Sequence, residues 1–138
     1  MNKKFISVKK LKIIDNDKGT VMHALKKSES SFDEFGELYF SNIEYNSVKA
    51  WKKHQNMTMN LVVPVGSVKF VFYNQQNNDF QEIILGPQNY SRITVLPNIW
   101  FGFQGLYKGN NLVMNLSNIE HDPSEVRRKE LSEIDYKW

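Results

Sequence analysis

Residues 48–73 read VKAWKKHQNMTMNLVVPVGSVKFVFY, and they decide the fold that we expect for this chain. Two apolar segments, at 57–63 and 68–73, are predicted to be strands, and in the second of them apolar side chains recur at every other position. A turn at 64–66, which holds a proline and a glycine, separates the two strands. The basic segment 48–54 precedes them, so charged and imidazole side chains adjoin apolar β structure here.

Outward from this stretch, short apolar segments alternate with turn residues. Further strands are predicted at 4–14, 20–25, 36–45, 48–51, 80–85, 90–96, 99–106 and 112–116. We expect a hairpin turn at 108–111 and a loop at 26–35, with Ser31 capping a single helical turn. A short helix is expected at 123–130, with Asp122 as its N-cap and Pro123 at its first position. About nine or ten short strands with almost no helix favour a β-sandwich or jelly roll.

Length and composition narrow the class of protein. A chain of 138 residues is expected to form one domain, over residues 1–138, and to bury about two thirds of its unfolded surface. The absence of cysteine excludes disulfides and thiolate metal sites and favours a cytoplasmic location. We find no signal peptide and no apolar run near the roughly 20 residues of a membrane span.

The charge pattern allows an anionic ligand. The net charge is +3, and lysines cluster at Lys49, Lys52 and Lys53. Such a cluster either attracts a phosphate-bearing ligand or is solvated surface. A nucleic-acid partner is not expected, because the chain has no arginine-rich stripe and no nucleic-acid-binding motif.

Acid–base catalysis is the chemistry that the residues leave open. The three histidines, His23, His54 and His121, form no HxH or HxxxH pair, so no metal site is expected. Nucleophilic catalysis lacks both a GxSxG motif and a cysteine. Neighbouring lysines disfavour the charged form of His54, which keeps it available as a base. Lys52 and Lys53 could stabilise a developing oxyanion, or they are solvated edge residues.

Four aromatic residues have either a structural or a ligand-binding role. Trp51, Trp100, Phe101 and Phe103 are either core residues or the wall of a pocket on which a flat or sugar-like ligand stacks.

Five motifs resemble a known family. They are DxDKG at 15–19, KAWxxH at 49–54, PxGxVxFVxY at 64–73, PNxWxxF at 97–103 and HDP at 121–123. In this order they resemble the dTDP-4-dehydrorhamnose 3,5-epimerase family of cupin jelly rolls, over residues 15–138. The resemblance is greatest to a shorter, divergent branch of the family that is associated with surface-polysaccharide sugar genes.

The resemblance implies an all-β cupin jelly roll that acts on a 4-keto-6-deoxy sugar nucleotide in polysaccharide or lipopolysaccharide biosynthesis, without metal or cofactor. In the family a histidine, oriented by an aspartate, removes the proton beside the keto group. A lysine steadies the enolate, a tyrosine returns a proton, and an arginine holds the diphosphate. The family also implies a homodimer, often with N-terminal strands exchanged, and the apolar segment 5–14 agrees with this.

The carry-over of residues is incomplete. Lys49 falls where the family has its arginine, and Lys52 where it has the catalytic histidine. His54 lies two positions further, on the same side of a regular strand. The position of the oxyanion lysine falls near Met59 or Asn60 and that of the acid tyrosine near Asn115, while Asp135 matches the orienting aspartate. We therefore expect catalytic roles for Lys52, His54 and Asn115, and substrate contacts from Lys49, Trp51, Asn60, Trp100 and His121.

Three functions remain open at the level of the sequence. The chain is an epimerase or isomerase with relocated chemistry, in which His54 or Lys52 is the base, and a basic Lys52 would need its pKa lowered by burial. Alternatively it is a sugar-nucleotide-binding module without catalysis. The third possibility is a structural or regulatory cupin that partners an enzyme of the pathway.

Overall fold

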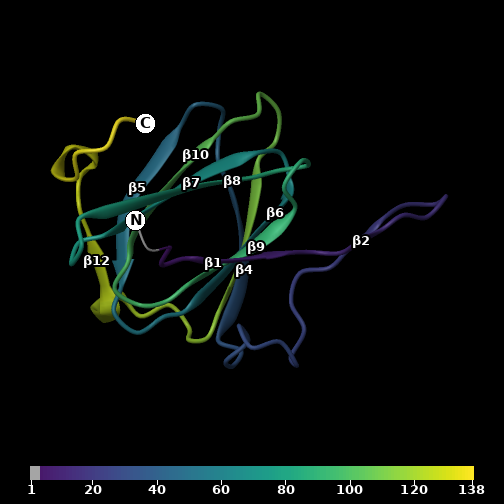
Figure 1. The fold of residues 1–138 in the computed structure, drawn as a ribbon, viewed down its shortest axis with the longest axis horizontal. Coiled ribbons are helices and arrows are strands. Elements are labelled where there is room, and N and C mark those ends of the chain that lie inside the picture. The colour runs from purple at the N-terminus through teal and green to yellow at the C-terminus, as the bar shows by residue number, and fades with distance from the viewer. Residues whose placement is uncertain (1–3) are drawn as a thin grey trace.

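The computed structural model describes residues 4–138, which form two five-stranded antiparallel sheets and a small hairpin (Figure 1). The strands are β1 (Ser7–Lys10), β2 (Ile13–Ile14), β3 (Val21–Met22), β4 (Glu37–Asn42), β5 (Val48–His54), β6 (Met59–Val65), β7 (Val68–Asn74), β8 (Asp79–Leu85), β9 (Ser91–Val95), β10 (Trp100–Gly105), β11 (Leu112–Ser117) and β12 (Val126–Arg128). Sheet I has the order β1-β9-β6-β11-β4, and sheet II has the order β12-β5-β10-β7-β8. This arrangement confirms the predicted all-β jelly roll.

The core lies between the two sheets and follows the period of two expected from the sequence. Val68, Phe70 and Phe72 of β7 are fully buried in it, whereas Val71 packs in a second cluster on the outer face of sheet II. In β6, Met59 and the alternate residues after it join the same core. Each buried phenylalanine stabilises the fold by about 1.5–3 kcal/mol.

Residues 108–111 do not form the predicted hairpin turn. They connect β10 of sheet II to β11 of sheet I, so the chain crosses between sheets here. The side-chain amide of Asn111 donates to the carbonyls of Ile43 and Tyr107, and its oxygen accepts from the backbone N–H of Ser67. Glycine and asparagine suit such a corner as well as a hairpin, which is why the sequence did not distinguish the two.

The predicted C-terminal helix is much shorter than expected. Asp122 caps a 3₁₀ turn, η1 (Pro123–Glu125), by accepting a hydrogen bond from the backbone N–H of Ser124. The chain then extends into β12, which pairs with β5, because β5 would otherwise be the open edge of sheet II. A second 3₁₀ turn, η2 (Leu131–Glu133), follows. Residues 31–34 form no helix, and only Ser31 among them belongs to a turn.

A buried arginine holds the loop before β4 against the outer face of sheet I. Arg92 of β9 is 1% exposed. Its Nη1 donates to the carbonyl of Ala24 and to Glu29, and its Nη2 donates to Ser31, each at 2.6 Å. These bonds compensate for burying the charge.

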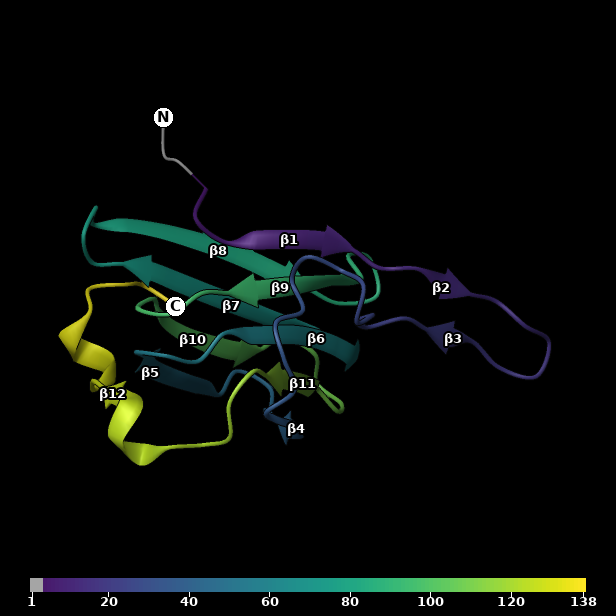
Figure 2. The ribbon, with the colours of Figure 1, turned by 90° about the horizontal axis from the view of Figure 1, so that it is seen from below.

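The two ends of the molecule differ. The β2–β3 hairpin projects beyond the sheets at one end, while the segment after β11 wraps the other end (Figure 2). Within residues 4–138, no helix has the length and apolar character needed to cross a membrane.

Candidate active site

A cavity of about 400 Å³ lies between the sheets, a volume typical of small-molecule sites. Sheet I lines it with Tyr39, Ser41, Met59, Leu61, Val113 and Asn115. Sheet II contributes three cationic residues, Lys49, Lys52 and Arg128, and three aromatic ones, Phe70, Phe101 and Phe103. The two sheets therefore form opposite walls, and the cations lie on the wall of sheet II.

An irregularity in β5 brings its two lysines to the cavity. Phe103 lies opposite Lys49 and Phe101 lies opposite Lys52. Trp51 is therefore an extra residue in β5, with no partner in β10. Without this bulge, residues three positions apart would point to opposite faces of the strand. With it, Lys49 and Lys52 both line the same cavity, and Nζ of Lys49 donates to the carbonyl of Asn42 at 2.9 Å. The peptide bond between Ala50 and Trp51, within the bulge, is cis.

His54 and Glu125 form a buried pair next to Phe101, a residue of the cavity wall. From Lys52 onward β5 is regular, so His54 shares the face of Lys52, and its ring stacks on that of Phe101 at a centroid distance of 6.0 Å. Nδ1 of His54 lies 2.6 Å from Oε1 of Glu125. Oε2 of Glu125 accepts from the backbone N–H groups of Gln55 and Asn56, at 2.9 and 3.0 Å.

The hydrogen bonds determine the protonation of this pair. Burial alone would raise the pKa of Glu125, but hydrogen bonds from Asn56, His54 and Gln55 bring that pKa below its ordinary value. The ionised carboxylate only accepts hydrogen bonds, so Nδ1 of His54 carries the proton. Nε2 is then the basic nitrogen, and it is buried without a hydrogen-bond partner. His54 is not itself among the residues that line the cavity, but Phe101, on which its ring stacks, is one of them. An unpaired basic nitrogen in this position is suited to removing a proton.

The imidazole is neutral at neutral pH. Burial lowers the pKa of His54, the hydrogen bond and the charge of Glu125 oppose this, and the positive charges of Lys52 and His121 add to the lowering. The net direction is below the ordinary value of 6.5. His54 is therefore available as a base under physiological conditions.

Lys52 lies next to a second cation, Arg128, its partner across β5 and β12. Burial lowers the pKa of Lys52, and the charge of Arg128 lowers it further, whereas Glu125 and Glu37 oppose both effects. Since Lys49 borders the same cavity, three basic residues line it. Such a group suits an anionic ligand or a developing oxyanion.

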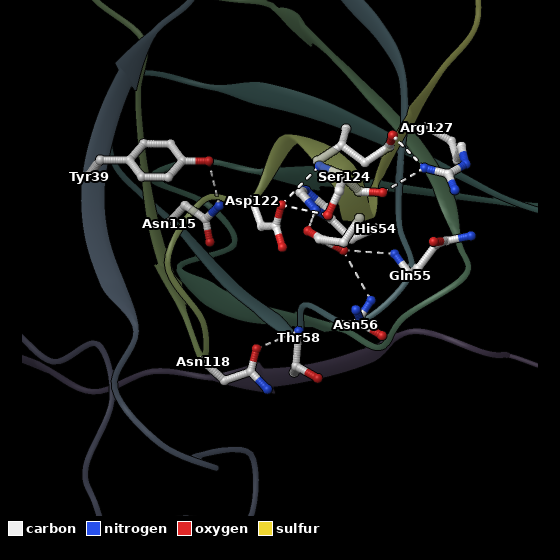
Figure 3. A network of polar contacts seen from close by, with 12 residues as sticks. Tyr39, His54, Gln55, Asn56, Thr58, Asn115, Asn118, Asp122, Ser124 and Arg127 are labelled. Atoms are coloured by element: carbon white, nitrogen blue, oxygen red, sulfur yellow. Dashed lines mark hydrogen bonds and ion pairs between the residues drawn. The ribbon is translucent and has the colours of Figure 1, made fainter.

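On the opposite wall, Tyr39 and Asn115 form a second polar pair. They lie opposite each other across β4 and β11. Nδ2 of Asn115 donates to the hydroxyl of Tyr39 at 2.9 Å, and in Figure 3 the ring of Tyr39 extends from β4 toward Asn115. Oδ1 of Asn115 is buried without a partner.

The structure places the predicted site residues in two groups. Lys49, Lys52, Trp51 and Asn115 border the cavity, and His54 adjoins it through Phe101. The ring of Trp51, however, packs on the outer face of sheet II, with Tyr136 and Trp138.

Three predicted substrate contacts do not lie at the cavity. Asn60 points to the outer face of sheet I, because its neighbours in β6 face inward, and there it bonds Thr94 and the carbonyl of Ser31. Trp100 lies on the outer face of sheet II beneath the ammonium groups of two lysines. His121 is exposed in the loop before η1.

Sequence reasoning missed Glu125, Arg128 and Tyr39. The first two lie in a segment predicted to be helical, and their roles depend on the pairing of β12 with β5. Asp135, the expected orienting carboxylate, is exposed in the C-terminal segment, and Glu125 is the residue bonded to His54. The only early signal was the capped turn at Asp122, which positions Glu125 at its end. No group of three or more His, Asp or Glu side chains that could hold a metal lies within residues 4–138.

Comparison with solved structures finds close similarity. A dTDP sugar isomerase from Desulfovibrio desulfuricans G20 is 31% identical, with a TM-score of 0.92 over 98% of this chain and 91% of that one. A sugar 3,4-ketoisomerase from Thermoanaerobacterium thermosaccharolyticum, in complex with TDP, is 17% identical, with a TM-score of 0.77 over 94% and 93%. A dTDP-4-dehydrorhamnose 3,5-epimerase from Sulfolobus tokodaii is also 17% identical, with a TM-score of 0.82 over 95% and 80%.

These matches differ in what they establish. No protein-family model and no curated protein matches the chain. The two structures at 17% identity show the fold alone. The match at 31% identity covers nearly the whole of both chains and shows the family. The chain therefore belongs to the epimerase-like cupin family of dTDP-sugar isomerases and epimerases, as its sequence motifs predict.

Proposed function

We propose that this protein epimerises or isomerises a dTDP-linked 4-keto-6-deoxy sugar by acid–base chemistry, in the biosynthesis of a surface polysaccharide or lipopolysaccharide. The observation that carries the proposal is the His54–Glu125 pair, which leaves Nε2 of His54 basic, buried and unpartnered beside a cation-lined cavity. A module that only binds its ligand has no need of a base held in this way.

The residues suggest how the reaction proceeds. Nε2 of His54 removes the proton from the carbon beside the keto group. The electron pair of that C–H bond forms a C=C bond, and the keto oxygen takes up the negative charge. Lys52 lies two residues away on the same face and stabilises this oxyanion, and its lowered pKa makes it a better proton donor to the oxygen. Reprotonation of the same carbon on the opposite face gives an epimer. Protonation of the former keto carbon, with loss of the O–H proton from the neighbouring carbon's hydroxyl, moves the carbonyl to that neighbouring carbon.

The same cavity offers contacts for the rest of a sugar nucleotide. We propose that Lys49 and Arg128, which both line the cavity, bind the diphosphate, and that the guanidinium of Arg128 supplies the bidentate geometry that Lys49 lacks. Phe101 and Phe103 provide apolar rings for the sugar or the base.

Isotope exchange tests this proposal. The protein is incubated with dTDP-4-keto-6-deoxyglucose in deuterated water, and deuterium at C3 and C5 of the sugar is followed by NMR. We expect enzyme-dependent incorporation at one or both carbons. The matched control is His54→Asn, whose amide can still donate to Glu125 but has no basic nitrogen, and it should lose exchange. Binding of dTDP without exchange in the wild type would refute the catalytic proposal and support a binding module instead.

We also propose that the protein forms a homodimer. Ile13, Ile14, Val21 and Met22 of the projecting β2–β3 hairpin leave between 38% and 56% of their surface exposed. Such exposed apolar side chains indicate an interaction surface. Sedimentation velocity should give a dimer that Val21→Asp dissociates, and a monomer at all concentrations would contradict the proposal. A cytoplasmic location, expected from the lack of cysteine, stays a prediction.

A further inference from the structure

We infer that Trp138 is a positioning residue for ligand binding, because it packs on the bulge of β5 and so fixes the relative positions of the basic residues that line the cavity. Trp138 ends the C-terminal segment 129–138, which lies on the outer face of sheet II. This role rests on the proposed function, since it assumes that a dTDP-linked ligand binds between the sheets. It extends that function by coupling the outer face of sheet II to the cavity on its inner face.

The backbone of the bulge is paired with the C-terminal segment. Trp51 is the extra residue of β5 and has no partner in β10. Its N–H donates to the carbonyl of Lys129, and its carbonyl accepts from the N–H of Lys129, both at 3.1 Å. Lys129 directly follows β12, so these two bonds continue the pairing of β5 with β12 through the bulge. The extra residue is therefore held by the C-terminal segment rather than by β10.

The side chain of Trp51 is held by the same segment. It is 2% exposed, and its Nε1 donates to the carbonyl of Leu131 at 3.4 Å. Its ring lies 5.3 Å from that of Trp138 and 6.2 Å from that of Tyr136, measured between centroids. Trp138 also borders Gly102, where the register between β5 and β10 shifts, since a Cβ on this glycine would lie 3.0 Å from its ring. Loss of the indole of Trp138 would therefore remove a side chain that packs on both strands at the bulge.

The bulge divides the basic residues of the cavity into two sets. Lys52 lies on the regular side of β5, together with His54, whereas Lys49 lies on the other side of the bulge. Arg128 directly precedes Lys129, the residue bonded to the bulge. A change at the bulge should therefore move Lys49 and Arg128 relative to Lys52 and His54, while the last two keep their spacing. Binding of a diphosphate should respond more strongly than proton removal.

Docking of the segment and binding of the ligand should therefore affect each other. Coupling between two sites is reciprocal, so a docked segment that improves the affinity for dTDP is itself stabilised by bound dTDP, by the same factor. A tryptophan that only covered the apolar outer face would contribute to stability without changing the affinity of the folded protein for dTDP. The two roles thus differ in a quantity that can be measured.

Variants of Trp138 test the effect on binding. Trp138→Ala should raise the Kd for dTDP on the order of 10-fold in isothermal titration calorimetry, and KM with it. The value of kcat should stay within a few fold, and the midpoint of the pH–rate profile should not move, because His54 keeps its place. Trp138→Phe retains a ring against Trp51 and should restore most of the affinity. Val62→Ala, at a buried residue on the outer face of sheet I, lowers stability away from the bulge and should leave the Kd unchanged.

Hydrogen exchange tests the reciprocal effect on the wild type. Saturating dTDP should slow exchange of the amide protons of Trp51 and Lys129, which bond each other's carbonyls, by a similar factor on the order of 10-fold. The amide protons of β1, an edge strand of sheet I, should exchange at an unchanged rate and serve as the internal control.

The outcomes separate this role from the proposed function. Wild-type affinity for dTDP in folded Trp138→Ala would overturn the assignment and leave the proposed function intact. An equal loss of affinity in Val62→Ala, or a fall in kcat at unchanged KM, would also overturn it. Should Trp138→Ala not fold, unchanged exchange of Trp51 and Lys129 in the wild type with dTDP bound would do so. A wild type that binds no dTDP would instead refute the proposed ligand, and this role with it.

Discussion

At the scale of single residues, Glu125 determines which nitrogen of His54 is basic. One carboxylate oxygen faces Nδ1 of His54, and the other accepts from two backbone N–H groups. All three contacts require an acceptor. The carboxylate therefore leaves only Nε2 free, which is the atom that the proposed reaction uses.

Glu125→Gln removes the negative charge of this side chain while keeping its size and shape. A carboxamide has one acceptor oxygen, and this oxygen would accept the hydrogen bonds from the backbone N–H groups of Gln55 and Asn56. The amide N–H then faces Nδ1, which places the imidazole proton on Nε2 and removes the base. We expect kcat to fall by about 10²–10⁴-fold, measured as turnover, with dTDP affinity unchanged. Glu120→Gln, at an exposed carboxylate, is the control, and wild-type activity of Glu125→Gln would contradict the assigned tautomer.

The depressed pKa of His54 predicts the pH dependence of activity. His54 must be neutral to act as a base, so kcat/KM should be constant through neutral pH and fall on the acid side. Because burial places the pKa of His54 below 6.5, the midpoint of this fall should lie below pH 6.5. A midpoint above 6.5 in the pH–rate profile would mean that burial does not dominate the environment of the imidazole.

The same shift links His54 to stability. The pKa of His54 is lower in the folded state, so the unfolded chain takes up this proton first as the pH decreases. Its contribution is present above pH 6.5 and is lost as the pH falls from there toward the folded pKa. Glu125, whose pKa lies below 4.5, adds a separate loss only below pH 4.5. Urea unfolding at pH 7.5 and 5.5 should show the first loss, and His54→Asn should reduce it.

At the scale of elements, the pairing of β5 with β10 depends on a small residue. Gly102 lies opposite Ala50, next to the bulge at Trp51. A Cβ on Gly102 would lie 2.4 Å from Cβ of Ala50 and 3.0 Å from the ring of Trp138. The close approach therefore requires glycine for space, since the backbone of Gly102 is not in the left-handed region.

Gly102→Ala should destabilise the protein by about 1–3 kcal/mol through overpacking. The free energy of unfolding in urea measures the effect. Ala50→Gly in the same chain removes the nearer of the two clashing groups, so the double variant should recover part of the lost stability. Strict additivity of the two changes would show that the contact between these residues is not the cause.

At the scale of the whole molecule, the segment after β11 has two tasks. It supplies Glu125 and Arg128 to the site, and its last residues cover the outer face of sheet II. The ring of Trp138 lies 5.3 Å from that of Trp51. Burial raises the pKa of Tyr136, and the hydrogen bond that its hydroxyl donates to Glu82 raises this pKa further. The segment thus protects an aromatic surface while holding β12 against β5.

Trp138→Ala should therefore reduce stability by roughly 2–4 kcal/mol, less than for a fully buried tryptophan because Trp138 is partly exposed. The midpoint of urea unfolding is the measurement. Lys137→Ala changes an exposed neighbour in the same segment and should leave the midpoint unaltered. An unchanged midpoint for Trp138→Ala would show that the outer face of sheet II does not need this cover.

The predictions from sequence succeeded where the pattern of residues within a single strand or turn determines its structure. Alternation in 68–73 placed Phe70 and Phe72 in the core, and the capped turn at Asp122 formed as expected. They failed where partners come from distant segments. The 108–111 corner has the composition of a hairpin, and β12 resembles a helix in sequence but is held as a strand by β5.

The sequence by itself determined the all-β fold and the family, because strand periodicity and the order of motifs can be recognised without knowing which residues are in contact. It also singled out Lys49, Lys52 and His54, which share a single strand. Only the tertiary structure decided which carboxylate orients His54 and that Tyr39 faces the cavity. Glu125 lies 71 positions from His54, and Asn115 lies 76 positions from Tyr39. Contacts across such separations arise from sheet pairing, which no local pattern encodes.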